Sequence, residues 1–351
     1  MATLRIATIG TGIIVDWFLE AVSAVDDVEY VGAYSRSLEK AREWGKPRGA
    51  RLFFDSLDEL AACPDIDAVY IASPNALHMP NALPLIKAGK HVLAEKAFAS
   101  NQREAREAFA KAHEQGVILM EALRTIHTPG FKALRQEVAQ AGDICGATLR
   151  FSKISSRVPA LRSGKLTNTF NPQMAGGGLM DIGVYCVAPM VALWGEPQRI
   201  VAMGTTFDVS SIGADPRWPL VELAGEALCD YGSFAVNLSW GKVSDNHLAS
   251  QIQGTEATIL VHGIDQLDSI SVMRPAKTEG IYGGYGSVNS VEERLTFPVT
   301  AMLADELADF AEACRGNYAL AEEFEDYTLA ELGVMDEIRR QIGTRFPADE
   351  H

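Results

Sequence analysis

The chain has 351 residues, 47% of them hydrophobic and 22% charged, which is the composition of an ordinary folded protein and not of a disordered one. This length predicts two domains, because single domains commonly span about 100–200 residues. The formal net charge of −15 repels polyanions, so nucleic acid is not an expected partner.

The first 122 residues alternate short apolar runs with helical segments. The expected strands are LRIATI, VEYVGAY, AVYIAS, HVLAEK and VILME, and the expected helices are Asp16–Ala24, Ser37–Trp44, Ala76–Ala88 and Gln102–Gln115. Alternation of this kind predicts an α/β domain with a doubly wound parallel sheet and right-handed crossovers.

From residue 123 to residue 351 the rhythm changes. Helices are expected over Thr128–Ala141 and Asp181–Trp194, and a strand over GATLRFSKI. Four β-type runs follow without helices between them: RIVAMGTTF, GEALCDYGSFAVNLSW, ATILVHG and SISVMR. Two further helices are expected over Ala301–Arg315 and Glu322–Ile342. We therefore expect a C-terminal α+β domain built on a large, mainly antiparallel sheet.

Cysteine usage and the N-terminus bear on the compartment. The five cysteines are scattered, with no C-x-x-C pair and no metal-ligand spacing to histidine: Cys63, Cys145, Cys186, Cys229 and Cys314. We expect a reduced, cytoplasmic protein without a metal site. The chain enters its first strand directly, and no apolar run is expected to reach the roughly 18 residues that span a bilayer, so neither export nor membrane insertion is expected.

A glycine-containing loop follows the first strand and opens the first helix, with the order Gly10, Thr11, Gly12, Ile13 and Ile14. The glycines permit a tight turn, and the helix N-terminus offers unpaired N–H groups to a pyrophosphate. A plain strand-to-helix turn is the alternative, and Val15 occupies the place of the fingerprint's third glycine. Within a βαβ unit the loop favours a dinucleotide-binding Rossmann domain.

The second strand ends at Ser35 and Arg36, where NAD enzymes usually place an acidic residue for the ribose 2′-hydroxyl. A hydroxyl and a guanidinium suit a 2′-phosphate better, because arginine offers forked donors to a dianion. NADP is therefore the preferred cofactor, with NAD also possible. Alternatively, Arg36 is a solvated loop residue and Ser35 or Ser37 caps the next helix.

Two further segments end strands at the edge where doubly wound sheets bind ligands. The first contains Ser73, Pro74, Asn75 and His78, and the second contains Glu95 and Lys96. We expect both at the cofactor, although the first also fits a turn with a helix cap and Lys96 also fits a solvated position. Beside a nicotinamide, burial and the positive ring would lower the pKa of Lys96 and make it a proton carrier near neutrality.

In the second domain a triple glycine, Gly176–Gly178, precedes Asp181 and Tyr185. Glycines let backbone approach a ligand closely, and residues at i and i+4 share one helix face. We expect a carboxylate and a phenol to point together, although Asp181 also fits an N-cap and Tyr185 a half-buried core position.

Together these motifs resemble, in order and spacing, the glucose-fructose oxidoreductase, inositol dehydrogenase and rhizopine-catabolism (Gfo/Idh/MocA) family. The resemblance covers essentially the whole chain, through IGTGII, AYSRSLEKA, DAVYIASPNALH, AGKHVLAEKAF, GGGLMDIGVYCV and IRRQIGTRFP. It implies that Lys96 is the catalytic acid/base, that Tyr185 stands where many members carry histidine, and that Asp181 orients the substrate. It also implies a homodimer or higher homo-oligomer that pairs through the open face of the C-terminal sheet, after residue 220.

Three residues depart from the family pattern. Ala97 replaces a proline, Val15 replaces a glycine, and Thr169 stands where several relatives carry an arginine. These departures affect the expected pocket shape more than the reaction type.

The function expected from the whole pattern is hydride transfer between NADP and a sugar, polyol or cyclic diol, without a metal. The segment 155–174, with Arg157, Arg162, Lys165 and Asn168, is expected to help select the substrate. The alternatives are an NAD-dependent inositol or amino-sugar dehydrogenase and a non-catalytic NADP-sensing regulator on the same fold.

Overall fold

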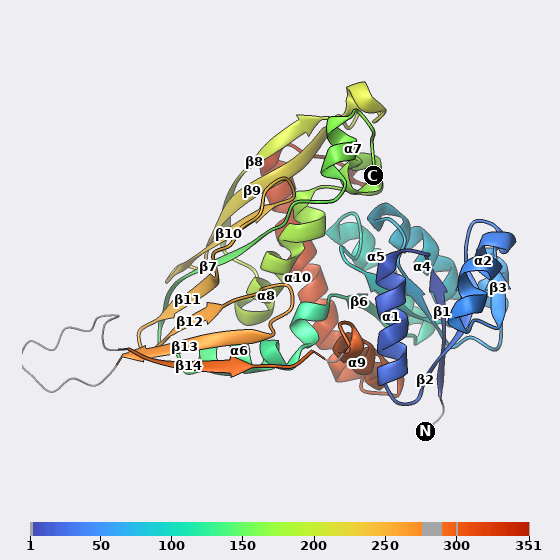
Figure 1. The fold of residues 1–351 in the computed structure, drawn as a ribbon, viewed down its shortest axis with the longest axis horizontal. Helices are drawn as coiled ribbons and strands as arrows, with labels where there is room; N and C mark the ends of the chain where they lie inside the picture. Colours follow the sequence, from blue (N-terminus) through green and yellow to red (C-terminus); the bar gives the residue numbers. More distant parts are fainter. Residues whose placement is uncertain (1–2, 276–289, 300, 351) are drawn as a thin grey trace, which may run out of the picture.

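The computed structural model describes residues 3–275, 290–299 and 301–350. Two sheets lie on either side of a layer of helices (Figure 1). The segment 276–289, part of the region after residue 220 expected at an oligomer surface, lies outside the described residues.

The first sheet has the strand order β3-β2-β1-β4-β5-β6, and all its neighbours are parallel. Its strands are β1 (Leu4–Ile9), β2 (Val28–Tyr34), β3 (Leu52–Phe54), β4 (Ala68–Ile71), β5 (His91–Glu95) and β6 (Leu119–Ala122). Its helices are α1 (Ile13–Ala24), α2 (Leu38–Gly45), α3 (Leu57–Ala62), α4 (His78–Lys87) and α5 (Gln102–Gln115). This confirms the doubly wound α/β domain, whose order reverses between β1 and β4.

Both faces of this sheet are buried. Along β4 alternate residues enter two separate hydrophobic clusters, with Ala68 and Tyr70 in one and Val69 and Ile71 in the other. Helices cover both faces, which explains why the strand reads as a continuous apolar run and not as an alternating one.

The second sheet has eight strands in the order β14-β13-β12-β11-β7-β10-β9-β8, and only the β7–β10 pair is parallel. Its strands are β7 (Ile144–Ser152), β8 (Arg199–Asp208), β9 (Leu220–Asp230), β10 (Ala235–Gly241), β11 (Ser250–Gly254), β12 (Thr258–Val261), β13 (Ser269–Pro275) and β14 (Ser290–Thr296). The helices of this half are α6 (Pro129–Ala139), α7 (Val158–Arg162), α8 (Val184–Trp194), α9 (Ala304–Cys314) and α10 (Tyr318–Ile342). The mainly antiparallel α+β architecture is therefore confirmed.

Helices α6, α8 and α10 pack on one face of this sheet, the face toward the first domain (Figure 1). Helix α10 also contacts β6 of the first sheet, and one hydrophobic cluster runs through both halves of the chain. The proposed division at residues 122 and 123 therefore stays a prediction, because the C-terminal helices tie the two sheets together.

One stretch, Pro172–Trp194, is long and apolar enough to cross a membrane by length and composition, contrary to the expectation that no run would reach that size. However, 89% of its apolar window is buried inside the fold. The stretch contains α8, which lies between the sheets and is apolar on all sides for that reason.

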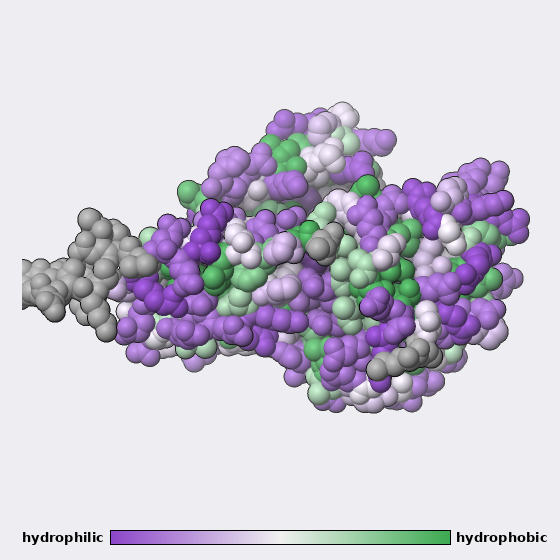
Figure 2. All heavy atoms as spheres, turned by 60° about the horizontal axis from the view of Figure 1, so that its bottom comes forward, coloured by the Kyte–Doolittle hydropathy of each residue, from purple (hydrophilic) through white to green (hydrophobic). Residues whose placement is uncertain are grey.

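The surface of the molecule is mostly hydrophilic. On the face shown in Figure 2 hydrophilic residues dominate, and hydrophobic residues gather in small separate patches.

Candidate active site

A cavity of about 520 Å³ opens where the carboxyl ends of the parallel strands meet the second domain. The loops after β1, β4 and β5 contribute to its first wall, and the segment preceding α8 contributes to the opposite wall. The residues that line it include Ile13, Ser73, Lys96, Arg124, Asp181 and Tyr185. This is the position at which open α/β sheets bind ligands.

Lys96 and Asp181 meet across this cavity although 85 positions separate them. The Lys96 Nζ donates to Asp181 Oδ1 at 2.7 Å and to the Asp181 backbone carbonyl at 2.8 Å. The second carboxylate oxygen, Oδ2, accepts from Nζ of Lys242. Asp181 therefore lies between two lysines, only one of which the sequence motifs identified.

Tyr185 lies against the same group of charges. The Lys96 Nζ is 4.9 Å from the centre of its ring, and the Arg124 guanidinium carbon is 5.5 Å from it. The ring of Phe151 meets it edge-on, with centroids 5.6 Å apart. The ammonium, the carboxylate and the phenol thus converge from two domains, which is the arrangement expected from the sequence.

The charges shift the proton affinities of these groups. Burial acts to lower the pKa of Lys96, but Asp181 and Tyr185 outweigh it and raise the pKa above its ordinary value. This differs from the expected lowering, because the expectation counted burial and the nicotinamide but not the carboxylate. Burial would raise the pKa of Asp181, yet Lys96 and Lys242 hold it well below its usual range.

Arg124 is fixed at the cavity by residues of the second domain. Its Nη2 donates to Asp265 Oδ2 at 2.8 Å, its Nε to the Asp265 carbonyl at 2.9 Å, and its Nη1 to Met302 Sδ at 3.0 Å. These residues are 141 and 178 positions away from Arg124, so the sequence contained no local signal for this arrangement.

The glycine loop has the conformation that a dinucleotide site requires. Gly10 has φ +123°, and a Cβ there would lie 2.7 Å from the carbonyl oxygen of Ala72. The helix α1 begins at Ile13, and no side-chain hydrogen bond caps its N-terminus. Its first N–H groups are thus available to a pyrophosphate, which is what the residue pattern predicted. Val15, in place of the third glycine, is fully buried in the core.

At the end of β2 the structure keeps Ser35 and Arg36 at the same edge of the sheet. The Ser35 amide donates to the Phe54 carbonyl at 3.1 Å, while the Arg36 side chain is exposed. The N-cap of helix α2 is Ser37, whose hydroxyl accepts from the Lys40 amide at 3.2 Å. The capping alternative therefore applies to Ser37, and Arg36 stays a predicted contact of the 2′-phosphate.

Two residues of the Ser73–His78 segment, Asn75 and His78, make hydrogen bonds to backbone carbonyls of neighbouring segments. His78 is fully buried, with Nε2 2.8 Å from the Ser73 carbonyl and Nδ1 3.1 Å from the Ala97 carbonyl. It therefore joins the two strand-end loops and does not face the cavity. Asn75 donates from Nδ2 to the Ala175 carbonyl at 2.9 Å, across the interface with the second domain.

Glu95 lines the cavity but is mostly buried, and its Oε1 accepts from the Tyr70 hydroxyl at 2.5 Å. Burial raises the pKa of Glu95 above its ordinary value. Ala97, which follows Lys96 in place of the expected proline, is fully buried and joined to it by a cis peptide.

The triple glycine serves contacts within the protein. A Cβ on Gly176 would lie 2.5 Å from the Asn168 carbonyl oxygen, and a Cβ on Gly178 would lie 2.8 Å from Oε1 of Glu222. Glu222 is buried and accepts from the Leu179 amide at 2.7 Å and from the Trp240 indole at 2.6 Å. The small residues thus let the backbone approach other parts of the chain, and their close approach to a ligand stays a prediction.

The segment 155–174 does not line the cavity in the structure. Its apolar residues Val158, Leu161 and Phe170 form a small separate cluster, while Arg157, Arg162, Lys165 and Asn168 are exposed. Thr169 is half-buried in the same segment. Among the residues that line the cavity from the second domain, Phe151, Lys153 and Asp265 were not identified by the motifs.

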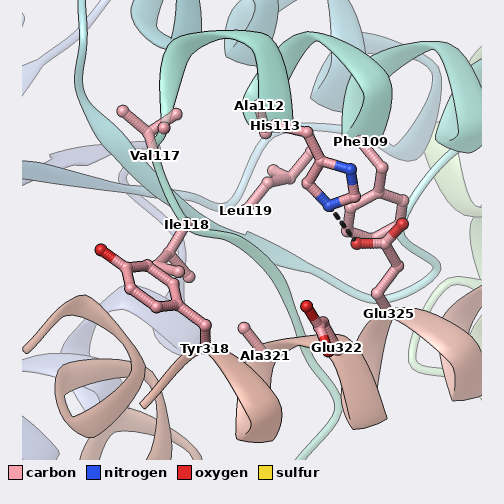
Figure 3. Close-up of a pocket in the computed structure, with 11 residues that line it drawn as sticks. Phe109, Ala112, His113, Val117, Ile118, Leu119, Tyr318, Ala321, Glu322 and Glu325 are labelled. Atoms are coloured by element: carbon pink, nitrogen blue, oxygen red, sulfur yellow. Dashed lines mark hydrogen bonds and ion pairs between the residues drawn. The ribbon is translucent and has the colours of Figure 1, made fainter. Parts of the chain in front are cut away.

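A second groove lies away from this site, between the end of α5, the start of β6 and the start of α10 (Figure 3). His113 and Glu325 meet there, with Nε2 and Oε2 2.8 Å apart. None of the residues predicted for the cofactor or substrate lines it. Within the described ranges, no group of three or more potential metal ligands is present.

The chain is similar to known oxidoreductases in both sequence and fold. The model of an oxidoreductase family with an NAD-binding Rossmann fold, GFO_IDH_MocA, matches residues 4–123. A scyllo-inositol 2-dehydrogenase (NADP(+)) of Bacillus subtilis is 36% identical, over 99% of both chains. The trans-1,2-dihydrobenzene-1,2-diol dehydrogenase of mouse is 34% identical over 57% of this chain and 60% of that enzyme. The segments LMEAL at 119–123 and IGTRFP near the end of the chain resemble enzymes of this kind. A 3-ketoreductase of Actinomadura kijaniata, solved with NADP, has a TM-score of 0.75 at 21% identity and covers 97% of both chains.

Proposed function

We propose that the chain is a dehydrogenase acting on a CH–OH group of a sugar, polyol or cyclic diol, because it belongs to the Gfo/Idh/MocA oxidoreductase family with its NAD-binding Rossmann fold. NADP is the preferred cofactor. The observation that carries the proposal is the convergence of Lys96 and Tyr185, from two domains, on one cavity at the strand ends.

The residues present fit a nicotinamide dinucleotide. Gly10 and Gly12 let the chain pass close to the pyrophosphate, the start of α1 supplies N–H donors, and Arg36 offers a guanidinium to a 2′-phosphate. When bound, the nicotinamide accepts a hydride in the oxidation and donates one in the reduction.

The side chains of the cavity handle the proton. Lys96 takes the proton of the substrate hydroxyl during oxidation and returns it during carbonyl reduction, and the Tyr185 phenol shares the hydrogen bond to the same oxygen. Asp181 orients Lys96 through two contacts, to its carboxylate and to its backbone carbonyl. Fixed placement of these groups against the reacting carbon supplies much of the acceleration.

The substrate class follows the relatives. The Bacillus subtilis relative is named for scyllo-inositol and the mouse relative for a cyclic dihydrodiol. A polyhydroxylated ring also matches a cavity that combines Lys96, Asp181 and Arg124 with the aromatic rings of Tyr185 and Phe151. An NAD-dependent inositol or amino-sugar dehydrogenase is the enzymatic alternative.

A screen of inositols, sugars and cyclic diols, followed through nicotinamide absorbance, tests the proposal. Lys96→Met and Tyr185→Phe are each expected to lose most of the turnover of the best substrate while still binding NADPH. Full activity of Lys96→Met would reject its assignment as the proton carrier. Tight NADPH binding without turnover of any compound would favour a non-catalytic, NADP-sensing regulator.

A further inference from the structure

A second lysine, Lys242, lies outside the cavity and contacts Asp181, the ion-pair partner of the predicted proton carrier Lys96. It follows directly after β10, and its backbone is held on both sides: its amide donates to the Leu223 carbonyl and its carbonyl accepts from the Ser155 amide, both at 2.9 Å. Its side chain is 7% exposed. Among the described residues, Asp181 is the only side chain to which its Nζ donates a hydrogen bond.

The array formed by Lys96, Asp181 and Lys242 has two ammonium groups and one carboxylate. The ammonium of Lys242 therefore offsets part of the attraction by which Asp181 holds the proton on Lys96, while the pKa of Lys96 still lies above its ordinary value. Lys96 lines the cavity and Lys242 does not. Lys96 is therefore the lysine that a substrate can reach.

Two ionisable groups that border the array lie in surroundings that disfavour charge. Burial raises the pKa of Glu95 and of Tyr185, so both favour their neutral forms. Arg124, also near the Tyr185 ring, is paired with Asp265.

Ionisable groups farther from the array also contribute to the charge around Lys96, Asp181 and Lys242. Lys153, an exposed residue that follows directly after β7, adds another cation. Two further carboxyls behind the site, Glu121 and Glu331, are buried, and burial raises the pKa of each. Glu222, whose pKa burial raises to about 7, interacts with Lys242 and enters the balance as a carboxylate above that pH.

We propose that Lys242 is a positioning residue for the reaction stated under Proposed function: it pairs with the second carboxylate oxygen of Asp181, so that the carboxylate orients Lys96 but holds its proton less tightly than a lone ion pair would. A lone Lys96–Asp181 ion pair would hold the proton on Lys96 and make it a poor base near neutral pH. With Lys242 in place, the same carboxylate serves two cations and holds each less tightly. This proposal rests on the proposed function.

The pH dependence of alcohol oxidation tests the proposal. In the wild type the rate should rise with pH as Lys96 loses its proton. In Lys242→Met and Lys242→Gln the midpoint should move upward by about one to two pH units, the usual effect of one neighbouring charge. Lys242→Gln retains a donor toward Asp181 without the charge, so it separates charge from hydrogen bonding. Lys242→Arg should restore the midpoint to within about half a pH unit, because it retains the charge.

An unchanged midpoint in Lys242→Gln, with NADPH binding intact, would overturn the proposal, because a merely structural lysine changes the rate and not the midpoint. A midpoint in Lys242→Arg that is shifted as far as in Lys242→Gln would overturn it equally. Since both variants keep a polar side chain at this position, the test does not depend on Lys242→Met being stable.

A second measurement separates this proposal from the proposed function. In the cofactor-free protein, the rate at which an amine-selective acylating reagent labels Lys96 is followed against pH by peptide mass spectrometry. The labelling midpoint should be about one to two units higher in Lys242→Gln than in the wild type. If this shift appears but no sugar or polyol is turned over, the proposed function fails and the role of Lys242 stands. If turnover is normal and neither midpoint moves, the role of Lys242 alone is wrong.

Discussion

The side-chain amide of Asn75 donates a hydrogen bond of 2.9 Å to the backbone carbonyl of Ala175, 100 positions later in the chain. This contact joins the loop after β4, which borders the predicted cofactor site, to the segment that leads into the triple glycine. Ala175 has a left-handed backbone with φ +50°. The two walls of the cavity are therefore connected directly beside the site.

Replacement of Asn75 by alanine should loosen this connection. We expect the free energy of unfolding to fall by about 1 kcal/mol, the usual contribution of one hydrogen bond, and the KM for the substrate to rise several-fold with a smaller change in kcat. Asn81→Ala is the matched control, because the Asn81 amide bonds to Ser73 within the first domain. Equal rises of KM in both variants would contradict a specific role of the interdomain bond.

Gly10 and Gly12 should respond differently to alanine. Gly10→Ala forces a side chain into φ +123° and against the Ala72 carbonyl, so we expect a loss of about 1–3 kcal/mol in stability together with weaker NADPH binding. At Gly12 an added Cβ meets no described atom within 4 Å. Gly12→Ala should therefore keep the melting temperature and lose only cofactor affinity. Thermal unfolding and NADPH fluorescence titration measure the two effects, and unchanged affinity in Gly12→Ala would mean that no cofactor approaches this loop.

Cofactor preference tests the assignment of Arg36. Arg36→Ala should weaken NADP binding by about 10- to 100-fold, the contribution of a charge-assisted hydrogen bond, and leave NAD binding nearly unchanged. Arg42→Ala, an exposed arginine on α2, serves as the control. Parallel losses for NADP and NAD in Arg36→Ala would show that this residue does not distinguish the two cofactors.

Much of the fold could be predicted from local patterns. The apolar runs of β1, β2, β4 and β5 and the amphipathic segments of α1 and α5 lie where the sequence indicated them. The missed elements lack such a signal. Strand β3 has three residues at the edge of its sheet, and β11 reads SQIQG because it is packed on one face only.

The candidate site could be predicted only where a motif ends a strand or precedes a helix. Lys96, Asp181 and Tyr185 were identified in this way and do lie together. Lys242 and Arg124 were not identified, because their roles depend on partners 61 and 141 positions away. Both contacts form within the second domain, whose folding brings together residues that are far apart in the sequence.

Glu222 should make stability depend on pH. Burial raises its pKa to about 7, against an ordinary value of 4.5, so the folded state holds this proton more tightly than the unfolded state does. Its contribution is therefore complete below pH 4.5 and is lost as pH rises to about 7. The loss is on the order of 3 kcal/mol, at about 1.4 kcal/mol for each pH unit.

Urea unfolding of the wild type and of Glu222→Gln between pH 4.5 and pH 8 measures this loss. The wild type should lose stability relative to the variant over that range. Glu226→Gln, at an exposed position of the same strand, should run parallel to the wild type. A constant difference between the wild type and Glu222→Gln would show that Glu222 does not titrate in this range.

The outer face of the second sheet is the surface on which we expect oligomerisation. Met203 on β8 is 76% exposed, and beside it Val201 on β8 is paired with Leu228 on β9, both exposed as well. Helices cover the opposite face of this sheet (Figure 1). A row of exposed apolar side chains on a regular sheet is typical of an interface between subunits.

A charge in this row should disrupt that interface. Met203→Glu is expected to convert a dimer into monomers, because a carboxylate buried between two apolar faces without a partner is costly. Sedimentation velocity at several protein concentrations measures the change. Tyr318→Glu is the control, since Tyr318 is 61% exposed at the start of α10, in the second groove of Figure 3. Each protomer should retain cofactor binding, because the cavity lies on the side of the sheet away from Met203. If Met203→Glu and the wild type sediment as the same dimer, the subunits associate through a different surface.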